Sequence, residues 1–104
     1  MNMLNSVILE GDVKSYAKND GFIDFIVASS RNSIAENGDK IEVITEVPCR
    51  VFGNLAAHFG KVTEIGHGVR VVGRLAGSDG KIILICEHLE WKFSPKKKTE
   101  KTSK

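Results

Sequence analysis

The feature that most constrains the fold of this chain is the alternation of apolar and polar residues along five separate segments. These segments are residues 4–13, 22–31, 41–52, 69–76 and 81–93. Residues two apart on a strand lie on the same face, so each segment is predicted to be a β-strand with one buried face. The predicted inward residues are Val7, Leu9 and Val13; Ile23, Phe25 and Val27; Ile41, Val43, Val47, Cys49 and Val51; Val69, Val71 and Leu75; and Leu89, Trp91 and Phe93.

Breaker residues separate these segments. The stretches "AKNDG" at 17–21 and "GSDG" at 77–80 indicate tight turns, and "NSIAENGDK" at 32–40 indicates a polar loop. Gly11 lies inside the first strand, where a glycine indicates a bulge or a close approach of another backbone. Pro48 has no N–H to donate, so it favours an edge or a bend in the third strand.

A short helix is predicted between the third and fourth strands. Asn54 is the expected N-cap, and Leu55, Phe59 and Val62 recur at helical spacing to form one apolar stripe. Gly60 weakens a helix by about 1 kcal/mol relative to alanine, so the helix should be brief.

Five strands with a short helix between the third and fourth have the connectivity of an OB-fold, a five-stranded Greek-key barrel. A barrel of this size is filled by its own side chains. Any ligand must therefore lie on the outer face, across the second and third strands and their neighbouring loops. We expect residues 1–94 to form the OB-fold domain and residues 95–104 to form a basic, disordered tail.

Length and composition are ordinary for one globular domain, since the chain has 104 residues of which 41% are hydrophobic. It contains no apolar run near the roughly 20 residues of a membrane span and no pattern typical of a signal peptide, so we expect a cytoplasmic protein. The net charge of +2 arises in the last nine residues, which hold five Lys and one Glu. The rest of the chain is slightly acidic, so bulk charge does not argue for nucleic acid; only a local arrangement of cations can.

The two cysteines, Cys49 and Cys86, lie inside apolar segments and are expected to be buried free thiols. No CxxC or HxxxH pair is present, so neither a metal site nor a cofactor is predicted. The chain also lacks a recognisable catalytic triad, paired carboxylates and a phosphate-cradling glycine loop. We therefore expect a binding protein and not an enzyme.

Five stretches in series resemble the bacterial single-stranded DNA-binding protein family. These are "LNSVILEGDV" (4–13), "FIVASSR" (25–31), "VPCRVFGNLAA" (47–57), "GVRVVGRL" (68–75) and "ICEHLEW" (85–91), and together they span residues 4–93 in the family's order. The resemblance implies an OB-fold that forms homo-oligomers, usually tetramers in preference to dimers. It also implies sequence-independent binding of single-stranded DNA, or RNA, in replication, recombination or repair. By position, Phe52 matches a base-stacking aromatic and Trp91 matches a core aromatic.

The chain departs from this family in three places. Glu46 stands where the family often has a second stacking aromatic, and an acid there would repel phosphate. The hairpin between the fourth and fifth strands, "AGSDGK" (76–81), is shorter than the family's usual arm. The chain ends in lysines, where the family usually has an acidic tail that recruits replication and repair proteins.

Phe52 is the leading candidate for a binding residue. It follows Val51 by one position and Cys49 by three, so on a strand its side chain lies on the opposite face from theirs. The alternative is a bulge at Pro48, which would shift the register and bury the ring. Arg50 and Arg31 are the next candidates, because the second and third strands should form the groove.

Five further residues complete the predicted nucleic-acid site. They are Arg70 and Arg74, which are either phosphate contacts or solvated outer charges; Tyr16, which either stacks on a base or caps the barrel; and two lysines at the loops, Lys14 and Lys81. Trp91 and Phe59 are expected to be core residues.

A second function fits the same sequence. A primosomal-type OB-fold accessory protein, whose main role is docking replication proteins, would have this length and would lack the acidic tail. Glu46 is the discriminating feature, because an acid in the groove opposes DNA binding.

Overall fold

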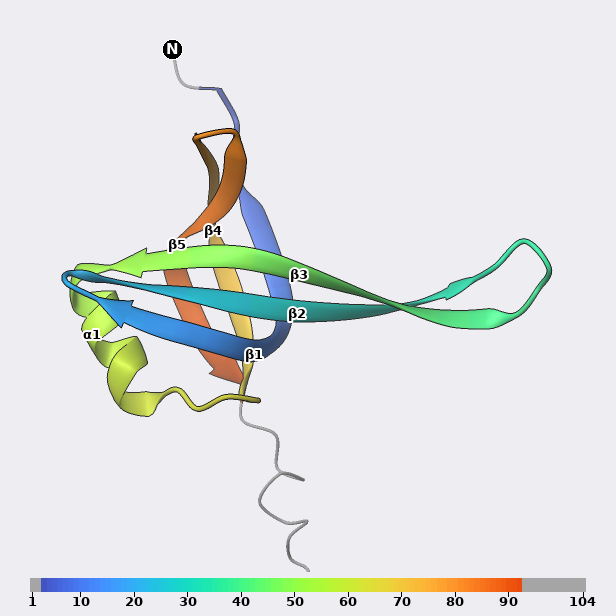
Figure 1. Cartoon of the computed structure of the whole chain (residues 1–104), viewed down its shortest axis with the longest axis horizontal. Helices are drawn as coiled ribbons and strands as arrows, with labels where there is room; N and C mark the ends of the chain where they lie inside the picture. Colours follow the sequence, from blue (N-terminus) through green and yellow to red (C-terminus); the bar gives the residue numbers. More distant parts are fainter. Residues whose placement is uncertain (1–2, 93–104) are drawn as a thin grey trace, which may run out of the picture.

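The computed structural model describes residues 3–92, and the expected lysine-rich tail at 95–104 and Phe93 lie outside them. The elements are β1 (Val7–Asn19), β2 (Phe22–Ile34), β3 (Lys40–Phe52), α1 (Gly53–Val62), β4 (Gly68–Ser78) and β5 (Lys81–Lys92). The strands close into a barrel in the order β1-β2-β3-β5-β4 (Figure 1). The predicted five-stranded OB-fold with one short helix between the third and fourth strands is therefore confirmed.

The barrel closes through two features that local alternation does not show. β1 pairs with β2 along its second half and with β4 along its first half, so one strand joins both parts of the sheet. The seam between β3 and β5 is a short parallel pairing of Cys49 with Leu84 and of Arg50 with Ile85. Closure leaves no free sheet edge at this position of the barrel.

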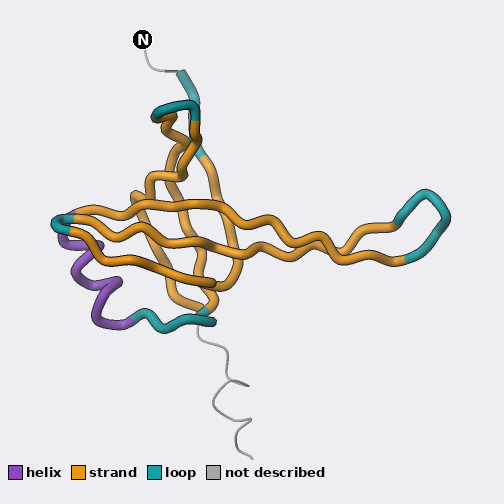
Figure 2. The backbone as a smooth tube through the Cα atoms, viewed as in Figure 1, coloured by secondary structure: helices purple, strands orange, loops and turns teal. Residues whose placement is uncertain are grey.

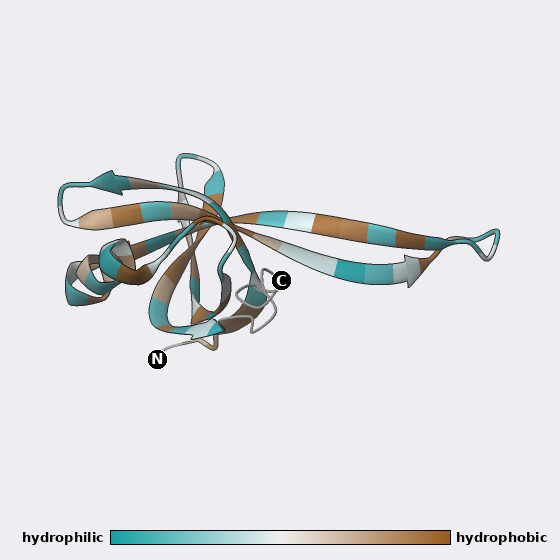
Figure 3. Cartoon of the chain, turned by 90° about the horizontal axis from the view of Figure 1, so that it is seen from below, coloured by the Kyte–Doolittle hydropathy of each residue, from teal (hydrophilic) through white to brown (hydrophobic). Residues whose placement is uncertain are grey.

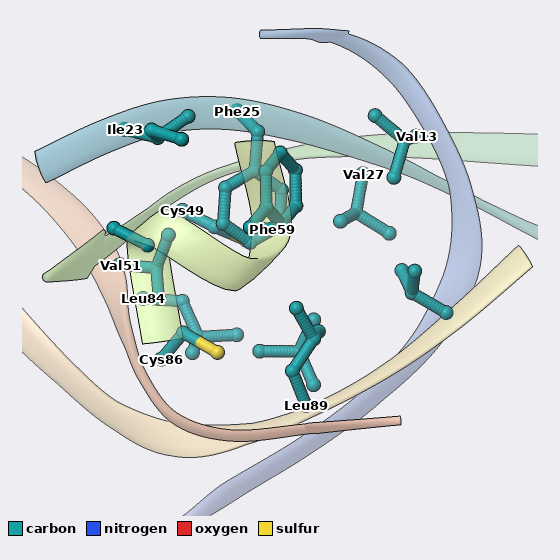
Figure 4. Close-up of a cluster of buried hydrophobic side chains, with 13 residues drawn as sticks. Val13, Ile23, Phe25, Val27, Cys49, Val51, Phe59, Leu84, Cys86 and Leu89 are labelled. Atoms are coloured by element: carbon teal, nitrogen blue, oxygen red, sulfur yellow. The ribbon is translucent and has the colours of Figure 1, made fainter. Parts of the chain in front are cut away.

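The barrel interior is filled by side chains from every strand and from α1 (Figure 4). Phe59 of α1 is fully buried, and its ring centroid lies 4.6 Å from that of Phe25 on β2. The helix therefore closes one end of the barrel, and the prediction that Phe59 is a core residue is confirmed. The buried hydrophobic cluster contains Val13, Ile23, Phe25, Val27, Cys49, Val51, Ala56, Phe59, Val69, Val71, Leu84, Cys86 and Leu89.

Gly11 occupies a position where another backbone comes close. A Cβ atom at Gly11 would lie 2.4 Å from the carbonyl oxygen of Ala28, so no other residue fits without moving β1 from β2. The prediction of a close approach is confirmed. The irregularity in the β1–β2 ladder lies instead between Val13 and Ser15.

The start of α1 differs from the sequence-based prediction. Phe52, and not Asn54, occupies the N-cap position, and it supplies no side-chain hydrogen bond to the helix. Asn54 was favoured because its side chain is a common cap. The helix starts two residues earlier because Gly53, at φ +63°, makes the sharp change of direction directly after β3.

β2 and β3 pair without interruption from Phe22 with Phe52 to Ile34 with Lys40. Pro48 lies opposite Ile26 in this ladder, and no residue is inserted beside it. The alternative of a bulge at Pro48 is therefore wrong. The inside–outside alternation of β3 continues past Pro48, so Cys49 and Val51 are buried while Phe52 remains 49% exposed.

Beyond the barrel, β2 and β3 continue as a two-stranded arm, formed by residues 29–45 (Figures 1 and 2). The predicted polar loop at 32–40 is much shorter, because β2 runs to Ile34 and β3 starts at Lys40. Ile41 and Val43 were predicted to face the core but are 44% and 45% exposed. They lie on the same face of β3 as the buried residues, but the arm extends past the barrel, so no core packs against them.

Leu75 was also predicted to be buried and is 43% exposed. It lies in β4 after the irregularity at Val72 and Gly73, toward the hairpin that joins β4 to β5. Alternation indicates the face of a residue but not whether that face is covered at that point of the strand. Asp79 and Gly80 form the tight turn of this hairpin, both with positive φ, as the short "GSDG" stretch predicted.

Candidate nucleic-acid interface

Two aromatic rings lie side by side on the outer face of β2 and β3. Phe22 pairs directly with Phe52 in the ladder, and their ring centroids are 6.0 Å apart at an interplanar angle of 47°. Phe52 is half-exposed and Phe22 is partly buried. We call this pair the Phe22–Phe52 platform; it presents an aromatic surface large enough to contact a nucleobase.

Sequence reasoning missed Phe22. Strand alternation could have identified it, because Phe22 is two residues before Asp24 and therefore lies on the same outer face of the strand. Only the pairing register shows that Phe22 lies opposite Phe52.

Arg50 extends the platform along β3. Its guanidinium carbon lies 4.5 Å from the centroid of the Phe22 ring, a cation–π distance. It also makes a bidentate ion pair with Asp24, with Nε–Oδ1 and Nη2–Oδ2 distances of 2.6 and 3.2 Å. The hydrogen bond with Asp24 raises the pKa of Arg50. The guanidinium is thus held in a fixed orientation, and its charge is partly neutralised.

A surface groove of about 460 Å³ continues from Arg50 across the outer faces of β1, β2, β3 and β5. Ile26 and Pro48 line it with apolar surface, and Ile83 of β5 forms part of its wall. Asp24 and Arg50 provide its charged groups. The groove can therefore accept a flat apolar group that carries a polar edge.

Lys14 and Glu46 form an ion pair across the sheet. Lys14 was expected in a loop but lies within β1, between Val13 and Ser15, where the β1–β2 register shifts. Glu46 departs from the family pattern, and its negative charge is compensated by Lys14. The same contact means that Lys14 is already occupied by a carboxylate.

Arg31 is not brought together with Arg50 and Phe52. In the ladder Arg31 lies opposite Val43, on the face of β3 that also carries the buried residues. Arg50 and Phe52 lie on the other face. Arg31 is exposed on the arm, and no carboxylate among residues 3–92 pairs with it. The expected cluster of Arg31, Arg50 and Phe52 is therefore separated between two faces.

Arg70 and Arg74 lie on β4, which pairs with β1 and β5. Arg70 bonds Glu10 at 2.6 Å and Glu90 at 3.3 Å, and Arg74 bonds Glu87 at 3.0 Å. The hydrogen bond from Arg70, with a second from Lys92, lowers the pKa of Glu10. Both arginines are engaged in ion pairs, on strands away from the Phe22–Phe52 platform.

Tyr16 contacts the end of the barrel. Its ring meets the Phe59 ring edge-on at 5.4 Å, and its hydroxyl donates to the Thr63 carbonyl at 3.3 Å. These contacts favour the capping alternative over base stacking. Trp91 is partly buried against the core and donates from Nε1 to the Thr63 hydroxyl at 2.7 Å, which confirms the expected packing role.

Lys81 lies at the start of β5, beside the short β4–β5 hairpin, and is exposed. No carboxylate in the described part of the chain pairs with it. It is therefore a free cation, but it lies on a different hairpin from Phe52.

Cys49 and Cys86 are buried free thiols, as predicted. Burial raises the pKa of Cys49 to about 12 and that of Cys86 to about 11, so both are protonated and unreactive at neutral pH. Among residues 3–92 there is no group of three or more His, Cys, Asp or Glu side chains that could hold a metal ion. Within the same residues, no helix is long and apolar enough to cross a membrane.

Comparison with known proteins identifies relatives in structure but not in sequence. No protein-family model matches the chain, and no curated protein sequence matches it significantly. A deletion mutant of the single-stranded DNA-binding protein from Thermus aquaticus superposes with a TM-score of 0.74 at 23% identity. That match covers 89% of this chain and 52% of the Thermus protein, so the chain spans about half its length.

Two further structures are similar over nearly their whole length. A Plasmodium falciparum single-stranded DNA-binding protein, solved with single-stranded DNA, has a TM-score of 0.71 at 17% identity, covering 90% of this chain and 97% of that one. The protein PriB from Ralstonia solanacearum has a TM-score of 0.69 at 14% identity, covering 86% and 98%. At these identities the likeness establishes the fold, so the chain has the OB-fold seen in single-stranded DNA-binding proteins and in PriB.

Proposed function

We propose that this protein binds single-stranded DNA without sequence preference, by stacking bases on Phe52 and Phe22. The observation that carries the proposal is the half-exposed Phe22–Phe52 pair, with Arg50 held over one ring. An exposed aromatic pair is unfavourable in water and is suited to stacking with a base of any identity. The similar fold of single-stranded DNA-binding proteins, one solved with DNA, adds support. Proteins of that kind are binding proteins, so no enzymatic activity is proposed.

Titration of a labelled oligo-dT, followed by fluorescence anisotropy at several salt concentrations, tests this function. A labelled strand is preferable to intrinsic fluorescence, because the only tryptophan, Trp91, is packed against the core. We expect binding that weakens as salt rises, and oligo-U in parallel determines whether RNA is also bound. No binding at low ionic strength would refute the proposal.

We further propose that the protein acts as a homo-oligomer, with a tetramer favoured over a dimer, in cytoplasmic replication, recombination or repair. The arm supports association, because a two-stranded ribbon has little independent stability in water. It exposes Ile34, Ile41, Val43 and Ile44 on its two faces, visible as apolar bands along the arm (Figure 3). Light scattering tests this proposal, and a monomer at micromolar concentration would contradict it.

A second function remains supported by specific observations. PriB of Ralstonia matches this chain over nearly its whole length, and Glu46 adds an acid to the β2–β3 face. In this function the protein docks replication proteins, and DNA binding is secondary. Capture of purified primosome components by the immobilised protein, together with weak oligo-dT binding, would favour docking over strand binding.

A further inference from the structure

A second concave site lies next to the Phe22–Phe52 platform, between the β1–β2 turn and α1. It has a volume of about 320 Å³, and Phe22 forms part of its wall. Lys18 of β1 and Lys61 of α1 line it from two sides. Neither lysine was among the residues predicted from the sequence, because 42 positions separate them and only the closed barrel brings them together.

This pocket carries a positive charge that no neighbouring carboxylate of the described residues compensates. None of its lining residues is acidic, and neither Lys18 nor Lys61 has a carboxylate partner within residues 3–92. By contrast, Lys14, Arg50 and Arg70 are all paired with acids. Asp20, in the adjacent turn, does not line the pocket and forms no ion pair with either lysine. Two lysines therefore line the same pocket, and neither has a carboxylate partner in the part of the chain that the structure describes.

The end of the Lys18 side chain lies beside α1 at Gly60. A Cβ atom at Gly60 would lie 3.3 Å from Cε and 3.6 Å from Nζ of Lys18, so the lysine side chain lies closely over the helix at this position. Gly53, at the start of α1, donates its N–H to the Gly21 carbonyl at 3.2 Å and ties the two walls together.

We propose that this pocket binds a phosphate group of the single strand whose base stacks on the Phe22–Phe52 platform. The inference rests on the proposed function and names the residues that bind the backbone. Phe22 belongs both to the platform and to the pocket wall, so a base and its neighbouring phosphate can occupy the two sites together. Two unpaired lysines supply the charge, and within residues 3–92 no carboxylate lines the pocket to compete with a phosphate for them.

Salt dependence of oligo-dT binding tests this assignment, with Lys18→Gln, Lys61→Gln and the double variant. Each phosphate contact on a single strand contributes about 0.7 to the slope of log affinity against log salt. We expect the double variant to bind more weakly at low salt and to lose at least this amount of slope. Lys40→Gln is the matched control, since Lys40 is an exposed, unpaired lysine at the far end of the arm. It should retain the wild-type slope.

Ala57→Leu fills the pocket without changing charge. Ala57 lines the pocket, is exposed on α1 and tolerates leucine as a helix former, so the fold should be retained. We expect weaker binding in this variant, and movement of the Gly21 and Gly60 amide resonances when oligo-dT is added to the wild type.

The outcomes separate the two proposals. A wild type that does not bind oligo-dT refutes the proposed function and this inference together. Binding that depends on Phe52, with a wild-type slope in the folded Lys18→Gln/Lys61→Gln variant, refutes only the pocket. An equal loss of slope in Lys40→Gln also refutes it, because the effect would then be one of net charge.

Discussion

Replacing Phe52 with alanine removes the most exposed ring of the platform. Base stacking on an aromatic side chain is worth about 1–3 kcal/mol by alanine substitution. Phe52 is 49% exposed and already packs against Phe22, so only part of its surface is available to a base. We therefore expect the lower part of that range, about 1–2 kcal/mol, which weakens oligo-dT binding roughly 5- to 30-fold.

The assay must separate stacking from folding. Burying a whole phenylalanine contributes about 1.5–3 kcal/mol, so removing a half-buried ring should cost on the order of 1 kcal/mol of stability. Phe52→Leu retains most of this burial without an aromatic face, and Phe52→Trp enlarges the face. Anisotropy titrations should rank affinity as Trp, Phe, Leu and Ala in descending order, while thermal melts of the leucine variant remain near the wild type.

The double variant Phe22→Ala/Phe52→Ala completes the test. If the two rings form one platform, the double variant should lose less binding free energy than the sum of the two single losses, because each ring stacks partly through the other. Ile8→Ala is the control, since Ile8 is a 69% exposed apolar residue on β1, paired with β4. Wild-type affinity in a folded Phe52→Ala variant would refute stacking at this site.

Four other predictions follow from the same contacts. Glu46→Trp should strengthen oligo-dT binding severalfold, because it replaces an acid with a stacking ring, and unchanged affinity would place the strand elsewhere. Hydrogen bonds from Arg70 and Lys92 depress the pKa of Glu10 in the folded state, so they stabilise the fold above its ordinary pKa of 4.5 and this stability is lost as pH falls further. Melts should show less acid sensitivity in Glu10→Gln. Cys49 and Cys86, with pKa values of about 12 and about 11, should resist alkylation in native protein at pH 8 and react after unfolding, and labelling of the folded protein would contradict their burial. Ile44→Glu, at a 57% exposed position of the arm, should lower the oligomer mass in light scattering without changing the melt of the barrel.

Features that depend on one strand at a time could be predicted from the sequence. Alternation located the five strands and their inward faces, and it placed Phe52 on the outside because Cys49 and Val51 had to be inside. Gly11 was also interpreted correctly, since a glycine within an apolar strand has few other reasons to occur there.

Features that depend on register between distant strands could not be predicted. Arg50 was a candidate binding residue in the sequence, but its partner Asp24 is 26 residues away and becomes its neighbour only through the β2–β3 ladder. Phe22 pairs with Phe52 through the same ladder. The arm was missed for a different reason, because Ile41 and Val43 have the pattern of buried residues and only the length of the barrel shows that nothing covers them.

The ion pairs between cations and carboxylates limit the electrostatic contribution that this surface can make to nucleic-acid binding. Lys14, Arg50, Arg70 and Arg74 would each have to exchange a carboxylate for a phosphate, which reduces the net gain from each contact. A count of these cations therefore overestimates the electrostatic attraction between the protein and a nucleic acid. A strand bound mainly by the Phe22–Phe52 platform and two unpaired lysines would show a shallow salt dependence, and its affinity at high salt would come from stacking. This chain thus differs from a binder that relies on a basic groove: its aromatic pair, and not its arginines, should determine the affinity.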